Sequence, residues 1–172
     1  MPTLHVSSLS RLHETVRQTG ARRMITLINA TTPVERPAHI TAENHLYIGV
    51  SDIAAPLDGH IMPGHQHVKP LLDFVRSWDQ LHPMVIHCWA GISRSTAAAY
   101  ITHCALNPDT DEAIIARRLR KVSPSATPNP ALIAAADDLL KRHGRMIAAI
   151  QSIGRGVDAF EGVPFHFPTH DN

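Results

Sequence analysis

The chain has 172 residues, of which 44% are hydrophobic and 18% charged, and this length suits one domain around a single core. Its formal net charge of +1 gives no reason to expect a nucleic-acid or membrane-surface binder. Only two cysteines are present, so no disulfide framework is expected. No apolar run is long enough to span a bilayer, and residues 1–12 lack a signal-peptide pattern, so we expect a cytoplasmic location.

The first half of the chain alternates strand-like and helix-like stretches. Short apolar runs rich in Ile, Leu and Val are typical of buried strands, and apolar residues at helical spacing predict amphipathic helices. Stretches that carry several Pro and Gly residues, 31–37 and 51–64, are predicted to be loops. Strands are therefore expected over Leu4–Ser8, Met24–Ile28, His45–Val50 and Met84–His87. Helices are expected over Ser10–Thr19, where Gly20 ends the helix, and over His67–Leu81. The side chain of Trp78 is expected to pack in the core.

The second half is predicted to be mostly helical. An alanine-rich stretch from Ser95 to Cys104 begins it, and Cys104 is expected to be a buried packing residue there. Two patterns typical of helix N-caps follow. Asp109 with Glu112 predicts the start of a helix that runs to about Val122, and Asn129 with Pro130 predicts the start of a last helix that runs to about Ile150. Residues 1–153 are expected to form one domain. The tail 154–172 mixes Gly, Pro and aromatic residues, and its composition is compatible with packing on the body or with flexibility.

Strands that alternate with helices predict an α/β fold, with a central, mostly parallel sheet flanked by helices on both faces and a helical C-terminal half. In such sheets, ligand sites form at the carboxyl ends of the strands. Cys88 stands at this position, directly after the strand Met84–His87. The sequence therefore predicts a functional site around Cys88.

The segment from Cys88 to Ser95 has the features of an anion-binding loop. It joins a buried strand to a helix start, so its backbone N–H groups and the positive end of the helix can face one anion. Gly91 allows a backbone conformation that other residues resist. Arg94 can bind phosphate oxygens in a bidentate fork that lysine cannot copy. The residues expected to bind phosphate are Trp89, Ala90, Gly91, Ile92, Ser93 and Arg94.

The same surroundings favour the thiolate form of Cys88, which is the nucleophilic form of a cysteine. Ser95 can donate a hydrogen bond to the sulfur and help it leave when a phospho-enzyme breaks down. His87 is expected to support the loop through hydrogen bonds and not to act as a base. The alternative, an inert core cysteine, does not explain why Gly91, Arg94 and Ser95 follow at these positions.

The pattern from His87 to Ser95, His-Cys, five residues, Arg and then Ser, resembles the signature of the protein tyrosine phosphatase superfamily. Its form His-Cys-x-Ala-Gly-Ile-Ser-Arg-Ser resembles the dual-specificity branch. The stretch from Tyr47 to Asp52 looks like the strand and acid that precede the lid in that branch, and 119–129 is loosely similar to its later region. The likeness covers about residues 4–143.

The resemblance implies a two-step, metal-free reaction without a cofactor. Cys88 would attack phosphorus, and Arg94 with the loop amides would hold the phosphoryl oxygens. An aspartic acid would protonate the leaving oxygen and then activate water. Asp52 and Asp58 compete for this role. We favour Asp52, because a donor at the end of a strand is better positioned, while Asp58 lies in an Asp-Gly turn sequence.

The expected substrates are phosphorylated proteins or small phosphomonoesters. Trp89 and Ile92 add no charge to the loop, and this favours phosphotyrosine over the more highly charged phosphoinositides as substrate. Phosphoserine and phosphothreonine are expected to be accepted as well. Trp89 either stacks on an aromatic substrate or packs against the body. A phosphoinositide phosphatase, a catalytically weak phosphoprotein-docking module and a sulfur- or arsenate-handling enzyme remain alternatives, the last of which would need Cys104 as a resolving cysteine. The oligomeric state is left open.

The chain contains 13 histidines, and His60, His65 and His67 are the closest grouping. They could bind a metal, but no Cys or acidic residue accompanies them at a usual ligand spacing. We therefore predict a polar surface loop there and no metal.

Overall fold

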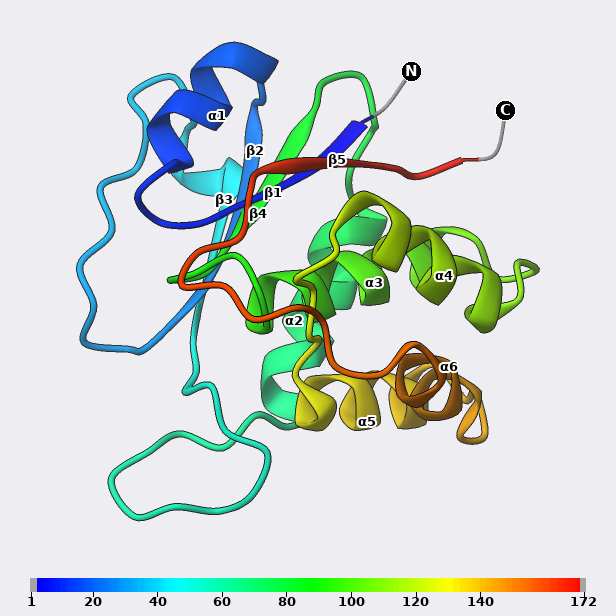
Figure 1. Ribbon diagram of the computed structural model, residues 1–172. Helices are drawn as coiled ribbons and strands as arrows, with labels where there is room; N and C mark the ends of the chain where they lie inside the picture. The colour runs from blue at the N-terminus through cyan, green and yellow to red at the C-terminus, as the bar shows by residue number, and fades with distance from the viewer. Residues whose placement is uncertain (1–2, 171–172) are drawn as a thin grey trace.

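A computed structural model describes residues 3–170 and contains one five-stranded sheet (Figure 1). Its strands lie in the order β3-β2-β4-β1-β5. The first four are mutually parallel, and β5 runs antiparallel to β1 at the edge. The mostly parallel sheet confirms the predicted fold class. The strands are β1 (Thr3–Ser7), β2 (Arg23–Ile28), β3 (His45–Gly49), β4 (Met84–His87) and β5 (Phe165–Pro168).

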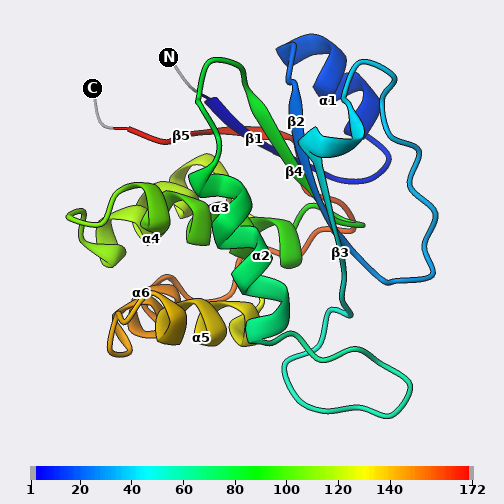
Figure 2. The ribbon, with the colours of Figure 1, turned by 180° about the vertical axis from the view of Figure 1, so that it is seen from behind.

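Helices cover both faces of the sheet, as predicted, but unequally. The first helix lies alone on one face, and the other five lie on the opposite face, as the two opposed views show (Figures 1 and 2). No helix within residues 3–170 combines the length and apolar character needed to cross a membrane. The helices are α1 (Leu12–Thr19), α2 (His65–Arg76), α3 (Arg94–Leu106), α4 (Glu112–Val122), α5 (Pro130–Leu139) and α6 (Arg145–Ile153), with a short 3₁₀ turn at Ala42–Asn44.

Strand β4 shows why the sheet needs helices on both sides. Met84 and Ile86 belong to the large core beneath α2–α6, whereas Val85 belongs to the smaller core beneath α1. Alternate residues of a strand point to opposite faces, so a strand that is apolar throughout must be buried on both. The predicted core positions of Trp78 and Cys104 are confirmed, and burial raises the pKa of the Cys104 thiol to about 12.

Two predictions about the later helices are wrong. The expected helix to Ile150 is divided into α5 and α6. The buried carboxylate of Asp137 accepts hydrogen bonds from the backbone N–H groups of Gly144 and Met146, and these bonds fix the turn between the two helices. The cap of α4 is Asp111 and not Asp109, since its Oδ1 accepts from the backbone N–H of Ala113 at 2.7 Å.

Residues 154–164, here called the C-terminal segment, return from α6 to the sheet and lead into β5 (Figure 1). Three backbone N–H groups tie the segment to the body. Gly156 donates to Thr127 Oγ1 at 3.1 Å, Val157 to the Pro124 carbonyl at 3.0 Å and Gly162 to the Ala90 carbonyl at 2.8 Å. The segment therefore lies across the loop that follows β4.

Candidate active site

The loop from Cys88 to Arg94 lies at the carboxyl edge of the sheet. It begins where β4 ends at His87, and it ends where α3 begins at Arg94. The parallel neighbours β1 and β2 end at the same edge, so the residues after them surround the loop. Cys88 itself is almost completely buried at the base of the loop.

Gly91 allows the loop to fold over Cys88. Its φ of +71° lies in the left-handed region, and a Cβ there would approach the backbone nitrogen of Ser8 to 2.9 Å. Any side chain at this position would therefore push the loop away from the turn after β1. Its N–H donates to Cys88 Sγ at 3.2 Å, so the tight turn also supplies a hydrogen bond to the sulfur.

Ser95 is the second partner of the Cys88 sulfur. Its Oγ lies 3.1 Å from Cys88 Sγ, and its side chain is buried in the first turn of α3. A thiol can donate to this hydroxyl, whereas a thiolate would accept from it. The sulfur also faces the N-terminal turn of a 13-residue helix, where the helix dipole favours negative charge.

Arg94 is anchored on one side and unpaired on the other. Its Nη1 donates to Asn29 Oδ1 at 2.7 Å and to the carbonyl of Val50 at 2.9 Å. Its Nε is buried and has no hydrogen-bond acceptor among residues 3–170. Leaving a buried donor unpaired costs about 1–3 kcal/mol. The guanidinium is therefore oriented by the protein and keeps a donor for an anionic ligand.

Asp52 is tied to the Cys88–Arg94 loop. Its Oδ1 accepts from the hydroxyl of Ser93 at 2.7 Å and from Asn129 Nδ2 at 2.9 Å. The other end of the Asn129 side chain caps α5 by accepting from the N–H groups of Ala131 and Leu132. Both donors meet Oδ1, and no hydrogen bond reaches Oδ2 from residues 3–170.

Asp58 has a different setting in the loop between β3 and α2. It is exposed and forms no hydrogen bond or ion pair within residues 3–170. A turn closes around it, since the N–H of His60 donates to the carbonyl of Leu57 at 3.1 Å. This loop protrudes from the body near α5 (Figure 1). Asp58 therefore has no contact that would hold it toward the sulfur.

His87 is held by a buried chain of hydrogen bonds across three strands. Its Nδ1 lies 3.2 Å from the Cys88 carbonyl, and its Nε2 lies 2.7 Å from Thr26 Oγ1, which is also 2.8 Å from His45 Nε2. A carbonyl only accepts, so the proton of neutral His87 is on Nδ1 and Thr26 donates to Nε2. Burial lowers the pKa of His87 to about 4, so the ring is neutral at pH 7.

Two of the three grouped histidines, His65 and His67, contact other residues through their side chains. His65 Nε2 lies 2.8 Å from Asp138 Oδ2, and His67 Nδ1 accepts from the N–H of Gly64 at 3.1 Å. Within residues 3–170, no three His, Cys, Asp or Glu side chains are grouped as metal ligands.

The structure thus brings together Cys88, Arg94, Ser95 and Asp52, with His87 beneath them. It also reveals two neighbours that the sequence interpretation did not assign to the site. Asn29 follows the carboxyl end of β2, a position at which its role could have been suspected. Asn129 was identified only as a helix cap, because the pairing of its amide with Asp52 spans 77 positions of the chain.

The fold is similar to those of several solved structures. The crystal structure of DUSP15 aligns with a TM-score of 0.62 and 17% identity, over 89% of this chain and 91% of that chain. Human DUSP28 aligns with a TM-score of 0.63 and 16% identity, over 83% and 94%. A human tyrosine phosphatase-like serine/threonine/tyrosine-interacting protein aligns with a TM-score of 0.61 and 14% identity, over 83% and 94%. No protein-family model and no curated protein sequence matches the chain.

The chain has the fold of the protein tyrosine phosphatase superfamily, in the form found in dual-specificity phosphatases. The resemblance seen in the loop sequence is therefore confirmed at the level of the fold.

Proposed function

We propose that the protein is a cysteine-dependent phosphatase that hydrolyses phosphomonoesters through a phosphocysteine intermediate. The observation that carries this proposal is the buried guanidinium of Arg94, which is anchored through Nη1 and keeps Nε unpaired at the end of the loop that begins with Cys88. An oxyanion with several equatorial oxygens, such as a phosphoryl group, suits this donor together with the loop N–H groups.

In the first step, the Cys88 thiolate attacks phosphorus, an S–P bond forms and the P–O bond to the leaving group breaks. Asp52, protonated on the oxygen that Ser93 and Asn129 leave free, gives its proton to the leaving oxygen. Arg94 and the loop amides stabilise the phosphoryl oxygens throughout.

In the second step, Asp52 accepts a proton from water, and the water oxygen attacks phosphorus. The S–P bond breaks, and inorganic phosphate leaves. The sulfur departs as a thiolate, which the N–H of Gly91 and the hydroxyl of Ser95 stabilise by donating to it. Neutral His87 acts by positioning the Cys88 carbonyl and transfers no proton.

The proposed substrates are phosphorylated proteins, with phosphotyrosine first and phosphoserine or phosphothreonine also admitted. The loop positions Trp89 and Ile92 are uncharged, and this is less suited to the crowded negative charge of a phosphoinositide. Both cysteines are free thiols, and a reducing compartment such as the cytoplasm, which we propose as the location, keeps a thiol nucleophile in this state.

A phosphoprotein-docking module without turnover is the second candidate. It is favoured by one finding, the similarity to a solved protein whose name describes it as phosphatase-like and as an interacting protein. The hydrogen-bonded carboxyl group of Asp52 favours the enzyme instead, since a docking module needs no acid at that position.

The test is turnover of para-nitrophenyl phosphate. We expect the native protein to release nitrophenol, vanadate to inhibit competitively and EDTA to have no effect. Cys88→Ser should abolish turnover and retain binding of vanadate or phosphate, because the loop and Arg94 remain. Retained turnover in Cys88→Ser would contradict the covalent mechanism. Inhibition by EDTA would instead point to a metal.

A further inference from the structure

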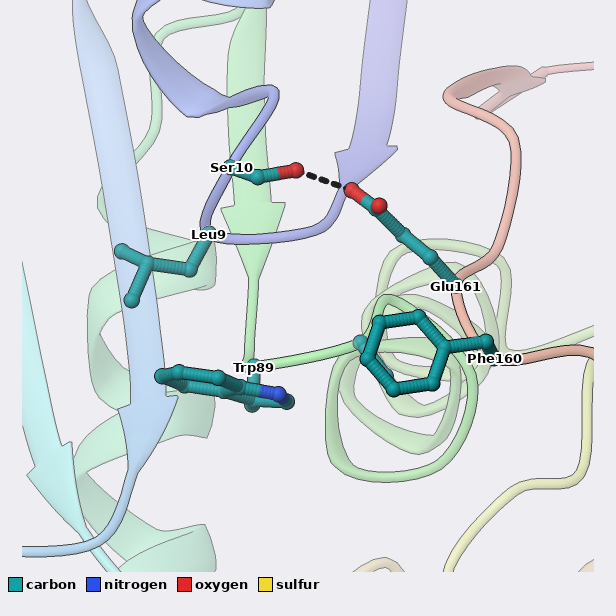
Figure 3. A pocket seen from close by; sticks show the side chains of 6 residues that line it. Leu9, Ser10, Trp89, Phe160 and Glu161 are labelled. Atoms are coloured by element: carbon teal, nitrogen blue, oxygen red, sulfur yellow. Dashed lines mark hydrogen bonds between the residues drawn. The ribbon is translucent and has the colours of Figure 1, made fainter.

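An apolar pocket lies directly beside the Cys88–Arg94 loop. It has a volume of about 170 Å³ and is lined by Leu9, Ser10, Trp89, Ala90, Phe160 and Glu161. Figure 3 shows the ring of Trp89 and the ring of Phe160 on two sides of this space, with Leu9 on a third. Glu161 and Ser10 form its polar rim, and a hydrogen bond joins them.

Both rings are unusually exposed for residues of this type. The exposed fraction is 92% for Phe160 and 57% for Trp89. Large apolar groups that remain in water side by side around a concavity are typical of a binding surface. The pocket therefore has the character of a recognition site for an apolar group.

Backbone hydrogen bonds attach both walls of the pocket to the phosphate-binding loop. The N–H of Leu9 donates to the carbonyl of Trp89 at 3.0 Å, and the N–H of Gly162 donates to the carbonyl of Ala90 at 2.8 Å. Gly162 is required for this close approach, since a Cβ there would lie 2.7 Å from the carbonyl oxygen of Gly91. The pocket is consequently held in a fixed place relative to Cys88.

We propose that this pocket binds an apolar side chain that neighbours the phosphorylated residue of a protein substrate. The proposal rests on the proposed function and adds to it a sequence preference. Trp89 and Ala90 line the pocket and directly follow Cys88, so the pocket lies beside the proposed phosphoryl site. Consecutive Cα atoms of an extended substrate peptide are about 3.8 Å apart, so the pocket suits a residue one or two positions from the phosphorylated one. An apolar cavity of about 150 Å³ is known to hold a benzene ring, so one leucine or phenylalanine side chain fits.

The charge on the rim sharpens the preference. The Glu161 carboxylate accepts from the hydroxyls of Ser8 and Ser10, and these hydrogen bonds lower its pKa, so it is an anion at pH 7. An acidic substrate residue at this position would be repelled. A second copy of the chain is a poorer occupant. A stable interface between two proteins buries roughly 800 Å² of surface on each partner, whereas this pocket has room for one side chain only.

The experiment compares three phosphotyrosine peptides that differ only in the residues on both sides of phosphotyrosine, which are Leu, Gly or Asp. We expect kcat/KM to be roughly tenfold higher for Leu than for Gly, and lowest for Asp. Phe160→Ala should reduce the ratio of Leu to Gly to about threefold or less. The matched control is Leu81→Ala, which removes an exposed apolar side chain in the turn before β4, and it should retain the native ratio.

Equal kcat/KM for the three peptides would overturn the proposal, and so would a preference that survives Phe160→Ala. A concentration-dependent dimer that Phe160→Ala abolishes would assign the pocket to a second copy and would also overturn it. If para-nitrophenyl phosphate is not hydrolysed, the proposed function fails on its own. In that case, calorimetric titration of the same peptides into Cys88→Ser tests whether the pocket binds an apolar side chain. Tighter binding of the Leu peptide would support the proposal, and equal binding of the three peptides would contradict it.

Discussion

The Cys88–Arg94 loop and the C-terminal segment lie against each other, but they are held in place in different ways. The loop is continuous with β4 and α3 at its two ends, and Gly91, Ser95 and Asn29 fix its key atoms. The segment is attached by the backbone N–H groups of residues 156, 157 and 162 and by the Glu161 carboxylate, which accepts from Ser8 and Ser10. Its aromatic residue Phe160 is exposed between these attachments.

The difference separates chemistry from recognition. A reaction that needs its groups placed within a fraction of an ångström is carried by a loop braced by the sheet. Substrate selection is assigned to exposed side chains of the C-terminal segment, which hydrogen bonds hold to the body at only a few residues. Changes in the loop should therefore reduce turnover of every substrate, and changes in the segment should alter preference or stability.

After the complete loss of turnover in Cys88→Ser, the largest effect is expected at Asp52, which is joined to the loop through Ser93. Asp52→Asn should lower kcat by roughly 10²- to 10³-fold and should remove the fall in rate at high pH, because that fall reports loss of the proton given to the leaving group. The measurement is a pH–rate profile with para-nitrophenyl phosphate.

Asp58→Asn is the matched control for Asp52→Asn, since it makes the same change a few residues further along the loop. It should leave the profile as in the native protein. If the two variants exchange behaviours, Asp58 is the acid and the protruding loop must close over the site during the reaction.

A smaller effect is expected at Asn29, which orients Arg94. Asn29→Ala removes the acceptor of one charge-assisted hydrogen bond and should lower kcat/KM by roughly tenfold, with a matching loss of vanadate affinity. The Val50 carbonyl remains as an acceptor, so the loss should be partial.

The control for Asn29→Ala is Asn44→Ala, whose side chain donates to Thr41 Oγ1 on the surface. Vanadate affinity and kcat/KM should be unchanged in it. A native vanadate affinity in Asn29→Ala itself would show that Arg94 does not depend on this anchor.

The smallest effect is expected in the C-terminal segment. Gly162→Ala forces a Cβ against the Gly91 carbonyl, so the segment must shift, and the free energy of unfolding should fall by about 1–3 kcal/mol. Urea unfolding measures this loss.

In the same variant, kcat/KM for para-nitrophenyl phosphate should fall less than the roughly tenfold loss expected in Asn29→Ala, while the preference among the three peptides should weaken. The control is Val163→Ala, which alters the neighbouring, exposed residue. It should change neither the turnover of para-nitrophenyl phosphate nor the peptide preference. A collapse of kcat in Gly162→Ala would mean that the segment shapes the reacting groups, and the separation of chemistry from recognition would be wrong.

Local patterns were enough to predict much of this molecule. The strand Met84–His87, the helix start at Asn129 and the loop of Cys88 and Arg94 each depend on neighbours in the chain, so periodicity, caps and residue types indicate them. The break between α5 and α6 was missed, because Asp137 acts on backbone groups seven and nine positions later.

The rest of the site depends on distant parts of the chain. The contact of Asn29 with Arg94 spans 65 positions, and that of Gly162 with Ala90 joins the end of the chain to its middle. No pattern in the single sequence encodes which distant segments meet. The pocket of Leu9, Trp89 and Phe160 could therefore be found only in the folded structure.

The central claim is that Cys88 attacks phosphorus while Arg94 holds the phosphoryl group. Its most direct test is to quench the native protein with acid during turnover of para-nitrophenyl phosphate and to map the modified peptide by mass spectrometry. We predict one phosphoryl group on the peptide that contains Cys88, and none in Cys88→Ser. Turnover that proceeds with no phosphoryl group on Cys88, or with one on another residue, would contradict the account.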